Sequence, residues 1–201
     1  MTTPLQPAAP RHARATRLVH MGLALSIIVQ LLTSLVFVAP SPTATGNIWF
    51  AAHAYVGLAA FGFVLLFWLV LTARRIGTTP GLLFPWFNGA RLAALWADTK
   101  VHLAALTRFR LPVFDAHAPL ASAVHGLGVL LMTAMALTGT IYYVINTGNP
   151  DAGGLVGVVM LVHKTLANLV WAYLIGHAGL GVVHHFASNQ SLGEMWSLRR
   201  N

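Results

Sequence analysis

The stretch of sequence that decides the fold is LVGVVMLVHKTLANLVWAYLIGHAGLGVVHHF, residues 155–186. It contains one charged residue, Lys164. As a helix it would be about 48 Å long, more than the roughly 30 Å of a bilayer core. Three further runs share its length and apolar character, and breaks rich in Pro, Gly and Asn follow the first and the third run. We therefore predict four membrane-spanning helices, over residues 18–38, 48–73, 120–145 and 155–186.

The composition of the whole chain supports a membrane domain. Of its 201 residues, 57% are hydrophobic and only 8% are charged, and the mean hydropathy is +0.71. A soluble domain carries about a quarter charged residues. The chain has no cysteine, which excludes disulfides, thiolate metal sites and covalently attached c-type haem. We predict an all-α, four-helix transmembrane bundle that forms one domain over residues 18–187.

The basic residues predict the orientation of the bundle. Eleven of the twelve Lys and Arg residues lie at the two ends of the chain or between the second and third spans. By the positive-inside rule, the tails 1–17 and 188–201 and the loop 74–118 lie in the cytoplasm of a multi-pass bacterial inner-membrane protein. The formal charge of +8 is thus explained by membrane topology, and no nucleic-acid partner is expected. A cleaved signal peptide in place of the first span is less favoured, because its apolar run is long.

The long cytoplasmic loop carries an amphipathic pattern. Apolar side chains recur in it at helical spacing, with charged residues between them. This pattern fits a helix lying in the membrane interface, and it fits a solvated connecting helix equally well. The apolar residues are Leu92, Leu95, Trp96, Leu103 and Leu106.

Histidines inside the spans are the candidate functional residues, because ionisable side chains are costly within a bilayer. His163 and His177 are fourteen residues apart, so they project from nearly the same helix face about 21 Å apart along the axis. His20 begins the first span on the cytoplasmic side, and His53 begins the second span on the periplasmic side. Matching depths predicts two pairs, His20 with His177 and His53 with His163.

Two imidazoles that face each other at each of two levels suit two b-type haems. Haem iron takes axial ligands from opposite sides of a flat ring, and each neutral imidazole donates its second N–H to a nearby acceptor. Gly22, Gly57, Gly176 and Gly179 would leave room for the ring between helices. Zinc is less favoured because the spans contain no acidic residue or cysteine. A histidine-based proton or metal transporter without haem is a further alternative.

These residues resemble the prokaryotic cytochrome b561 family, which is related to the cytochrome b subunits of nickel–iron hydrogenases and formate dehydrogenases. The resemblance spans about residues 17–197 and implies four axial ligands, His20, His53, His163 and His177, for two haems b. It is carried by His163-Lys-Thr-Leu-Ala-Asn-Leu, His177, Val183-His184-His185-Phe186, Arg17-Leu-Val-His20 and His53-Ala-Tyr-Val-Gly57.

Four further residues have secondary roles in this interpretation. His125 is not a ligand position in the resemblance, and we interpret it as a packed histidine rather than a neighbour of a propionate or of quinone. His184 and His185 would lie at the headgroup level, and His184 is the strongest rival as a ligand. Lys164 is the sole cation expected near the periplasmic haem.

We expect electron transfer across the membrane, to or from the quinone pool, with ubiquinone as a candidate substrate. Our hypothesis for direction is inward, from the periplasmic to the cytoplasmic haem. Two alternatives stay open: a superoxide:ubiquinone oxidoreductase acting alone, and a membrane subunit fed by a periplasmic dehydrogenase or hydrogenase. A basic funnel would help the first, but the outer loops carry only Asp151. The segment FPWFNGARLAALWADTK (84–100) and the stretch Leu137–Thr140 instead resemble the dehydrogenase and hydrogenase subunits.

Overall fold

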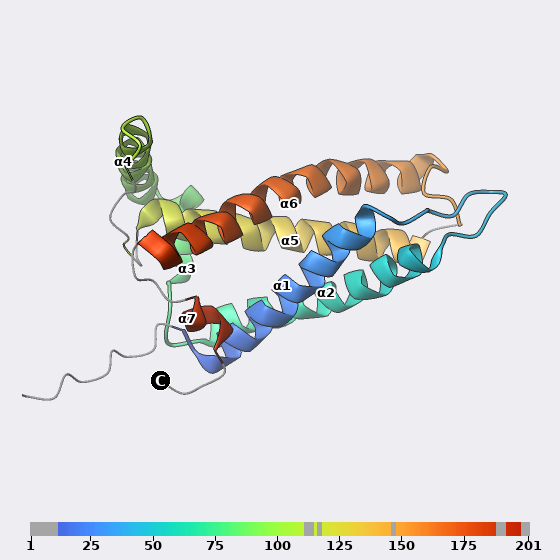
Figure 1. Ribbon diagram of the computed structural model, residues 1–201, viewed down its shortest axis with the longest axis horizontal. Helices are drawn as coiled ribbons and strands as arrows, with labels where there is room; N and C mark the ends of the chain where they lie inside the picture. Colours follow the sequence, from blue (N-terminus) through green and yellow to red (C-terminus); the bar gives the residue numbers. More distant parts are fainter. Residues whose placement is uncertain (1–11, 111–114, 116–117, 146–147, 188–191, 198–201) are drawn as a thin grey trace, which may run out of the picture.

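The computed structural model describes residues 12–110, 115, 118–145, 148–187 and 192–197. Within these residues the chain is helical and contains no β-strand (Figure 1). Four helices are long and apolar enough to cross a membrane. Many of their outward Leu, Ile and Val side chains are exposed, which suits a lipid environment rather than water. The four helices are α1 (Arg14–Ser34), α2 (Ile48–Ala73), α5 (Pro119–Ile145) and α6 (Gly154–Ala187).

The observed spans confirm the four predicted ones, with one correction in α1. The predicted first span ran to residue 38, but the helix begins at Arg14 and ends at Ser34. The Asn47 side chain explains the early end. Its amide oxygen accepts from Val38 N at 3.0 Å, and its Nδ2 donates to Val36 O at 3.2 Å. The same oxygen caps α2 by accepting from Phe50 N at 3.0 Å, so one residue holds the connection and starts the next helix.

The helices associate as two antiparallel pairs, α1 with α2 and α5 with α6, and α2 packs against α5. Figure 1 shows the two pairs close together at one end, which we call the loop end. Residues 38–47, between α1 and α2, and residues 148–153, just before α6, lie there. The two pairs diverge toward the opposite end, where most of the Arg and Lys residues lie, which we call the basic end. The main core lies midway between: Leu23, Ile27, Leu31, Ala60, Val64, Met132, Ala136 and Val170.

Glycines allow close helix contacts on α5. A Cβ placed on Gly126 would lie 1.9 Å from the Leu83 carbonyl oxygen, so α3 (Pro80–Leu83) can pack there only against glycine. A Cβ on Gly128 would lie 2.0 Å from the Tyr173 hydroxyl of α6. Small residues at such positions let membrane helices approach each other.

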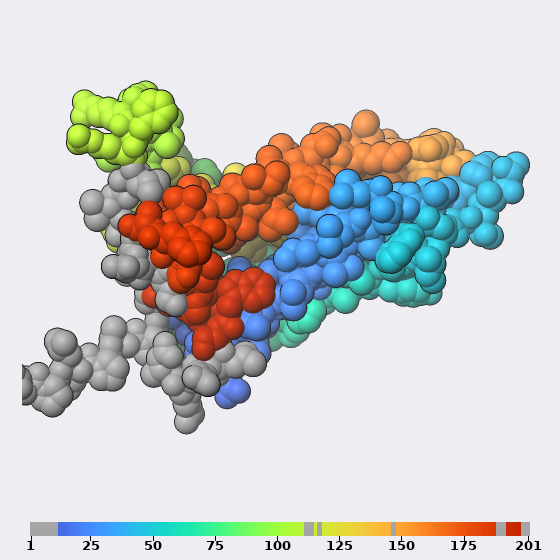
Figure 2. Space-filling view, in the orientation of Figure 1, coloured from blue at the N-terminus to red at the C-terminus, as the bar shows by residue number. Residues whose placement is uncertain are grey.

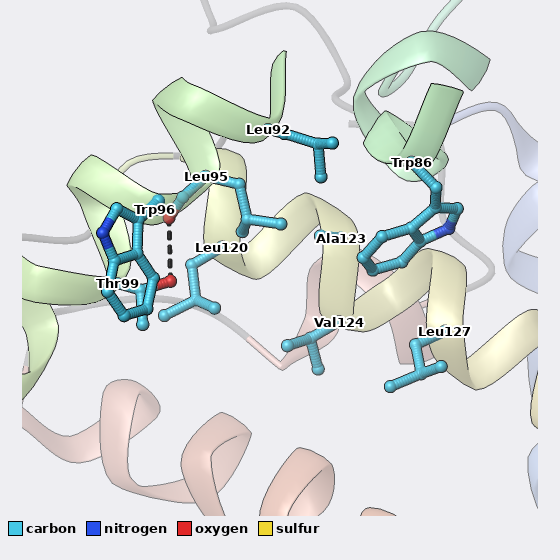
Figure 3. Close-up of a pocket in the computed structure, with 9 residues that line it drawn as sticks. All are labelled: Trp86, Leu92, Leu95, Trp96, Thr99, Leu120, Ala123, Val124 and Leu127. Atoms are coloured by element: carbon cyan, nitrogen blue, oxygen red, sulfur yellow. Dashed lines mark hydrogen bonds between the residues drawn. The ribbon is translucent and has the colours of Figure 1, made fainter. Parts of the chain in front are cut away.

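The loop between α2 and α5 forms a helical cap at the basic end. After α3 come a short 3₁₀ helix, η1 (Pro85–Phe87), and α4 (Gly89–Leu106), which projects beside the bundle (Figure 1). The expected helix over the amphipathic pattern is therefore present. Figure 3 shows part of its apolar face, with Leu92, Leu95 and Trp96, above the first turns of α5. Asp98 fixes this contact, because its Oδ2 accepts from Leu120 N at 2.9 Å and so satisfies a free amide at the start of α5.

Candidate functional site

The fold places the four predicted ligand residues on three helices at two levels. His20 lies in the second turn of α1, and His177 lies in the half of α6 nearer the basic end. His53 lies in the second turn of α2, and His163 lies in the half of α6 nearer the loop end. Because α6 is one unbroken helix, the two levels are about 21 Å apart along its axis.

At the basic end, imidazoles from α1, α5 and α6 come together. The ring centres of His20 and His177 are 6.3 Å apart, with the ring planes at 58°. The His125 ring of α5 meets His177 edge-on at 5.3 Å. Tyr173, one turn before His177, stacks on it at 5.3 Å with an interplanar angle of 8°. The site is thus an aromatic cluster around two candidate ligands.

The spacing of His20 and His177 fits a metal ion held between them. With metal–nitrogen bonds of about 2 Å and roughly 1.1 Å from each nitrogen to its ring centre, opposite imidazoles have centres about 6 Å apart. The observed 6.3 Å agrees with this value. The ring centres of His125 and His177 are closer, at 5.3 Å, and this edge-on contact is a packing contact.

Two further features of the basic end fit a bound prosthetic group. The Nδ1 atom of His20 is buried and has no hydrogen-bond partner among the described residues, which is costly unless a group absent here engages the ring. The backbones of α1 and α6 do not approach each other as neighbouring bundle helices normally do. Figure 2 shows the resulting opening between α6, in orange to red, and α1, in blue.

At the loop end lie His53, in α2, and His163, in α6. His53 Nδ1 lies 3.1 Å from Gln30 O and 3.0 Å from Thr33 Oγ1, both in α1. His163 Nδ1 lies 2.9 Å from Thr138 Oγ1 in α5. In both rings the Nδ1 atom is engaged with the protein, which leaves Nε2 as the nitrogen available to a metal.

Comparison with known families agrees with this geometry. A family model described as prokaryotic cytochrome b561 matches residues 11–198, nearly the whole chain. The chain belongs to the prokaryotic cytochrome b561 family. It is therefore a membrane cytochrome that binds b-type haem and transfers electrons. No curated protein and no solved structure matches the chain.

The cytochrome uses its glycines differently from the sequence-based interpretation. A Cβ on Gly22 would overlap the Phe63 ring, with its nearest atom 2.3 Å away, and a Cβ on Gly57 would lie 3.3 Å from Gln30 Nε2. Both glycines therefore accommodate side chains of neighbouring helices in this structure. By contrast, a Cβ on Gly176 or Gly179, beside His177, would meet no described heavy atom within 4 Å, so space is open there.

The secondary candidates occupy distinct places in the cytochrome. His125 joins the cluster at the basic end, and His184 and His185 lie partly exposed in the last turn of α6. Lys164 pairs with Asp151 across an exposed 3.0 Å contact at the loop end.

Sequence reasoning missed several neighbours of the cytochrome's histidines. Tyr173 could have been found, because it lies four residues before His177 on the same helix face. Trp196 could not have been, because no pattern predicts that the short helix α7 (Gly193–Trp196) returns to α1. There its ring centre lies 6.3 Å from that of His20.

Proposed function

We propose that this cytochrome carries electrons across the membrane through two b-type haems with bis-histidine ligation. His20 and His177 would hold one haem at the basic end, and His53 and His163 would hold the other at the loop end. The observation that supports the proposal is the placement of these four histidines at two levels of the bundle, with the ring centres of His20 and His177 6.3 Å apart. Bound haem supplies reversible one-electron redox chemistry at each level.

The protein's own residues have three tasks in this function. The histidines would hold the haem iron through their imidazole nitrogens, and such ligation would favour electron transfer over oxygen chemistry. The apolar core between the two levels, which includes Val64 and Val170 at 2% exposure each, keeps water out of the middle of the bundle. Tyr173 and Trp196 line the histidine cluster at the basic end and shield it with aromatic surface.

The distribution of charge supports an orientation with the basic end in the cytoplasm. Arg14 and Arg17 begin α1, and Arg74, Arg75 and Lys100 lie in the segment between α2 and α5. The positive-inside rule assigns such segments to the cytoplasmic side of the inner membrane. The haem held by His53 and His163 would then face the periplasm, and quinone is the acceptor or donor that we propose within the membrane.

The loop end favours a protein-fed cytochrome over an enzyme that collects superoxide alone. Attraction of a small anion needs a field of uncompensated positive charge. Lys164 is the one cation of the described loop end, and Asp151 pairs with it at 3.0 Å. This pair supports the interpretation in which a periplasmic dehydrogenase or hydrogenase subunit delivers the electrons. Co-purification of a second, redox-active protein is the expected result, and fast superoxide consumption by the purified chain would favour the alternative.

Conduction across the membrane is tested in vesicles. Purified protein is placed in liposomes that contain trapped ferricyanide, and dithionite is added outside. Reduction of the trapped ferricyanide should be much faster than in protein-free liposomes and should fall to that background in His177→Ala. An equal rate with and without the protein would refute the proposed function.

A further inference from the structure

A threonine hydroxyl from a neighbouring helix contacts each of the two histidines at the loop end. In α1, Thr33 Oγ1 lies 3.0 Å from His53 Nδ1, and the carbonyl of Gln30, three residues before Thr33, lies 3.1 Å from the same atom. Gln30 holds His53 a second time, because its Nε2 donates to His53 O. Thr33 is 4% exposed, so this contact is buried.

The second contact is made by α5, within the stretch Leu137–Thr140. Thr138 Oγ1 lies 2.9 Å from His163 Nδ1. Gly139 makes room for the ring, because a Cβ there would lie 3.2 Å from His163 Cε1. A threonine hydroxyl thus meets the Nδ1 atom of each histidine, from α1 in one case and from α5 in the other.

The hydroxyl protons fix the direction of these hydrogen bonds. Thr33 Oγ1 donates to Val29 O at 2.7 Å and is 3.0 Å from Gln30 O. Thr138 Oγ1 donates to Ala134 O at 2.8 Å and is 3.0 Å from Met135 O. A hydroxyl has one proton, and a carbonyl only accepts. Both oxygens must therefore accept from the imidazole, so Nδ1 carries the proton in both rings.

We propose that Thr33 and Thr138 are positioning residues that hold His53 and His163 in the Nδ1-protonated tautomer, with Nε2 directed to the iron of the loop-end haem. This inference rests on the proposed function, because it assumes that these two histidines are axial ligands. An acceptor on the far nitrogen orients a ligating imidazole and makes it a stronger base. A more basic ligand stabilises the ferric state, so the two threonines lower the reduction potential of this haem.

The described part of the basic end lacks this arrangement, which makes the inference specific. His20 Nδ1 has no hydrogen-bond partner among the described residues. Loss of a threonine hydroxyl should therefore change one haem and leave the other as it was. Threonine hydroxyls in membrane helices commonly bond to their own backbone. The control must be a threonine that makes such a backbone bond but contacts no histidine. Thr72 meets this condition, with its Oγ1 3.0 Å from both Trp68 O and Leu69 O.

The test compares Thr33→Val and Thr138→Val with Thr72→Val by potentiometric titration of the visible spectrum and by EPR. Valine keeps the shape of threonine and removes the hydroxyl acceptor, while the Gln30 carbonyl stays beside His53. We expect each of the first two variants to shift the reduction equilibrium of one haem about threefold toward the reduced form. At 59 mV per tenfold change, this raises its reduction potential by about 28 mV. The low-spin ferric signal of that haem should shift too, and Thr72→Val should change nothing.

Serine variants keep the inference testable where a valine variant loses haem. Thr33→Ser and Thr138→Ser retain the acceptor oxygen, so they should restore both the haem and its wild-type potential. The inference is overturned if both valine variants keep two haems with unchanged potentials and EPR signals, or if serine fails to restore what valine removed. Wild-type protein without haem would instead refute the proposed function.

Discussion

The pairing of the four histidines can be tested by combining alanine substitutions. The two levels lie about 21 Å apart along α6, and substitutions more than roughly 7–10 Å apart act independently. Each single variant should therefore lose one of two haems. The double variant His20→Ala/His177→Ala removes two ligands of one haem and should still hold one. The double variant His53→Ala/His177→Ala removes a ligand from each level and should hold none.

Haem per chain is the quantity to measure, by the pyridine haemochrome spectrum against amino-acid analysis of the same sample. His125→Ala is the matched control, because its ring also lies close to His177, at 5.3 Å, yet it should leave both haems bound. Circular dichroism and size-exclusion chromatography verify that each variant is folded. The proposed pairing is wrong if the double variant of the basic end loses both haems, or if His125→Ala loses one.

Two further predictions concern the packing at the basic end. Gly126→Ala should lower the free energy of unfolding in detergent by about 1–3 kcal/mol, because its Cβ would meet the Leu83 carbonyl oxygen at 1.9 Å. Gly62→Ala is the control, because its Cβ would meet no described atom within 4 Å, and it should be nearly neutral. Equal destabilisation by Gly126→Ala and Gly62→Ala would contradict this reasoning. Asp98→Ala should cost about 1 kcal/mol through the lost cap on Leu120 N. Asp98→Asn keeps an acceptor oxygen and should cost less, as chemical denaturation of both variants can establish.

The sequence predicted the helices and the levels of the histidines because both follow from one-dimensional patterns. Apolar length defines a span, and fourteen residues on a helix define a distance and a face. The end of α1 was predicted four residues too late, because it depends on the Asn47 side chain and not on hydropathy.

Contacts between helices were beyond the reach of these patterns. Thr33 and Thr138 look like ordinary threonines of apolar helices, and their importance comes from where α2 and α6 place His53 and His163. The return of Trp196 to His20 likewise depends on tertiary structure alone. Which atoms meet across a bundle is determined by helix rotation and register, which hydropathy does not encode.

The central claim is that each chain holds two b-type haems on four histidines. The most direct measurement is the reduced-minus-oxidised absorption spectrum of the purified wild-type protein, with haem and protein quantified in the same sample. The account predicts a b-type spectrum and two haems per chain. A colourless protein, or one haem per chain in fully loaded material, would contradict it.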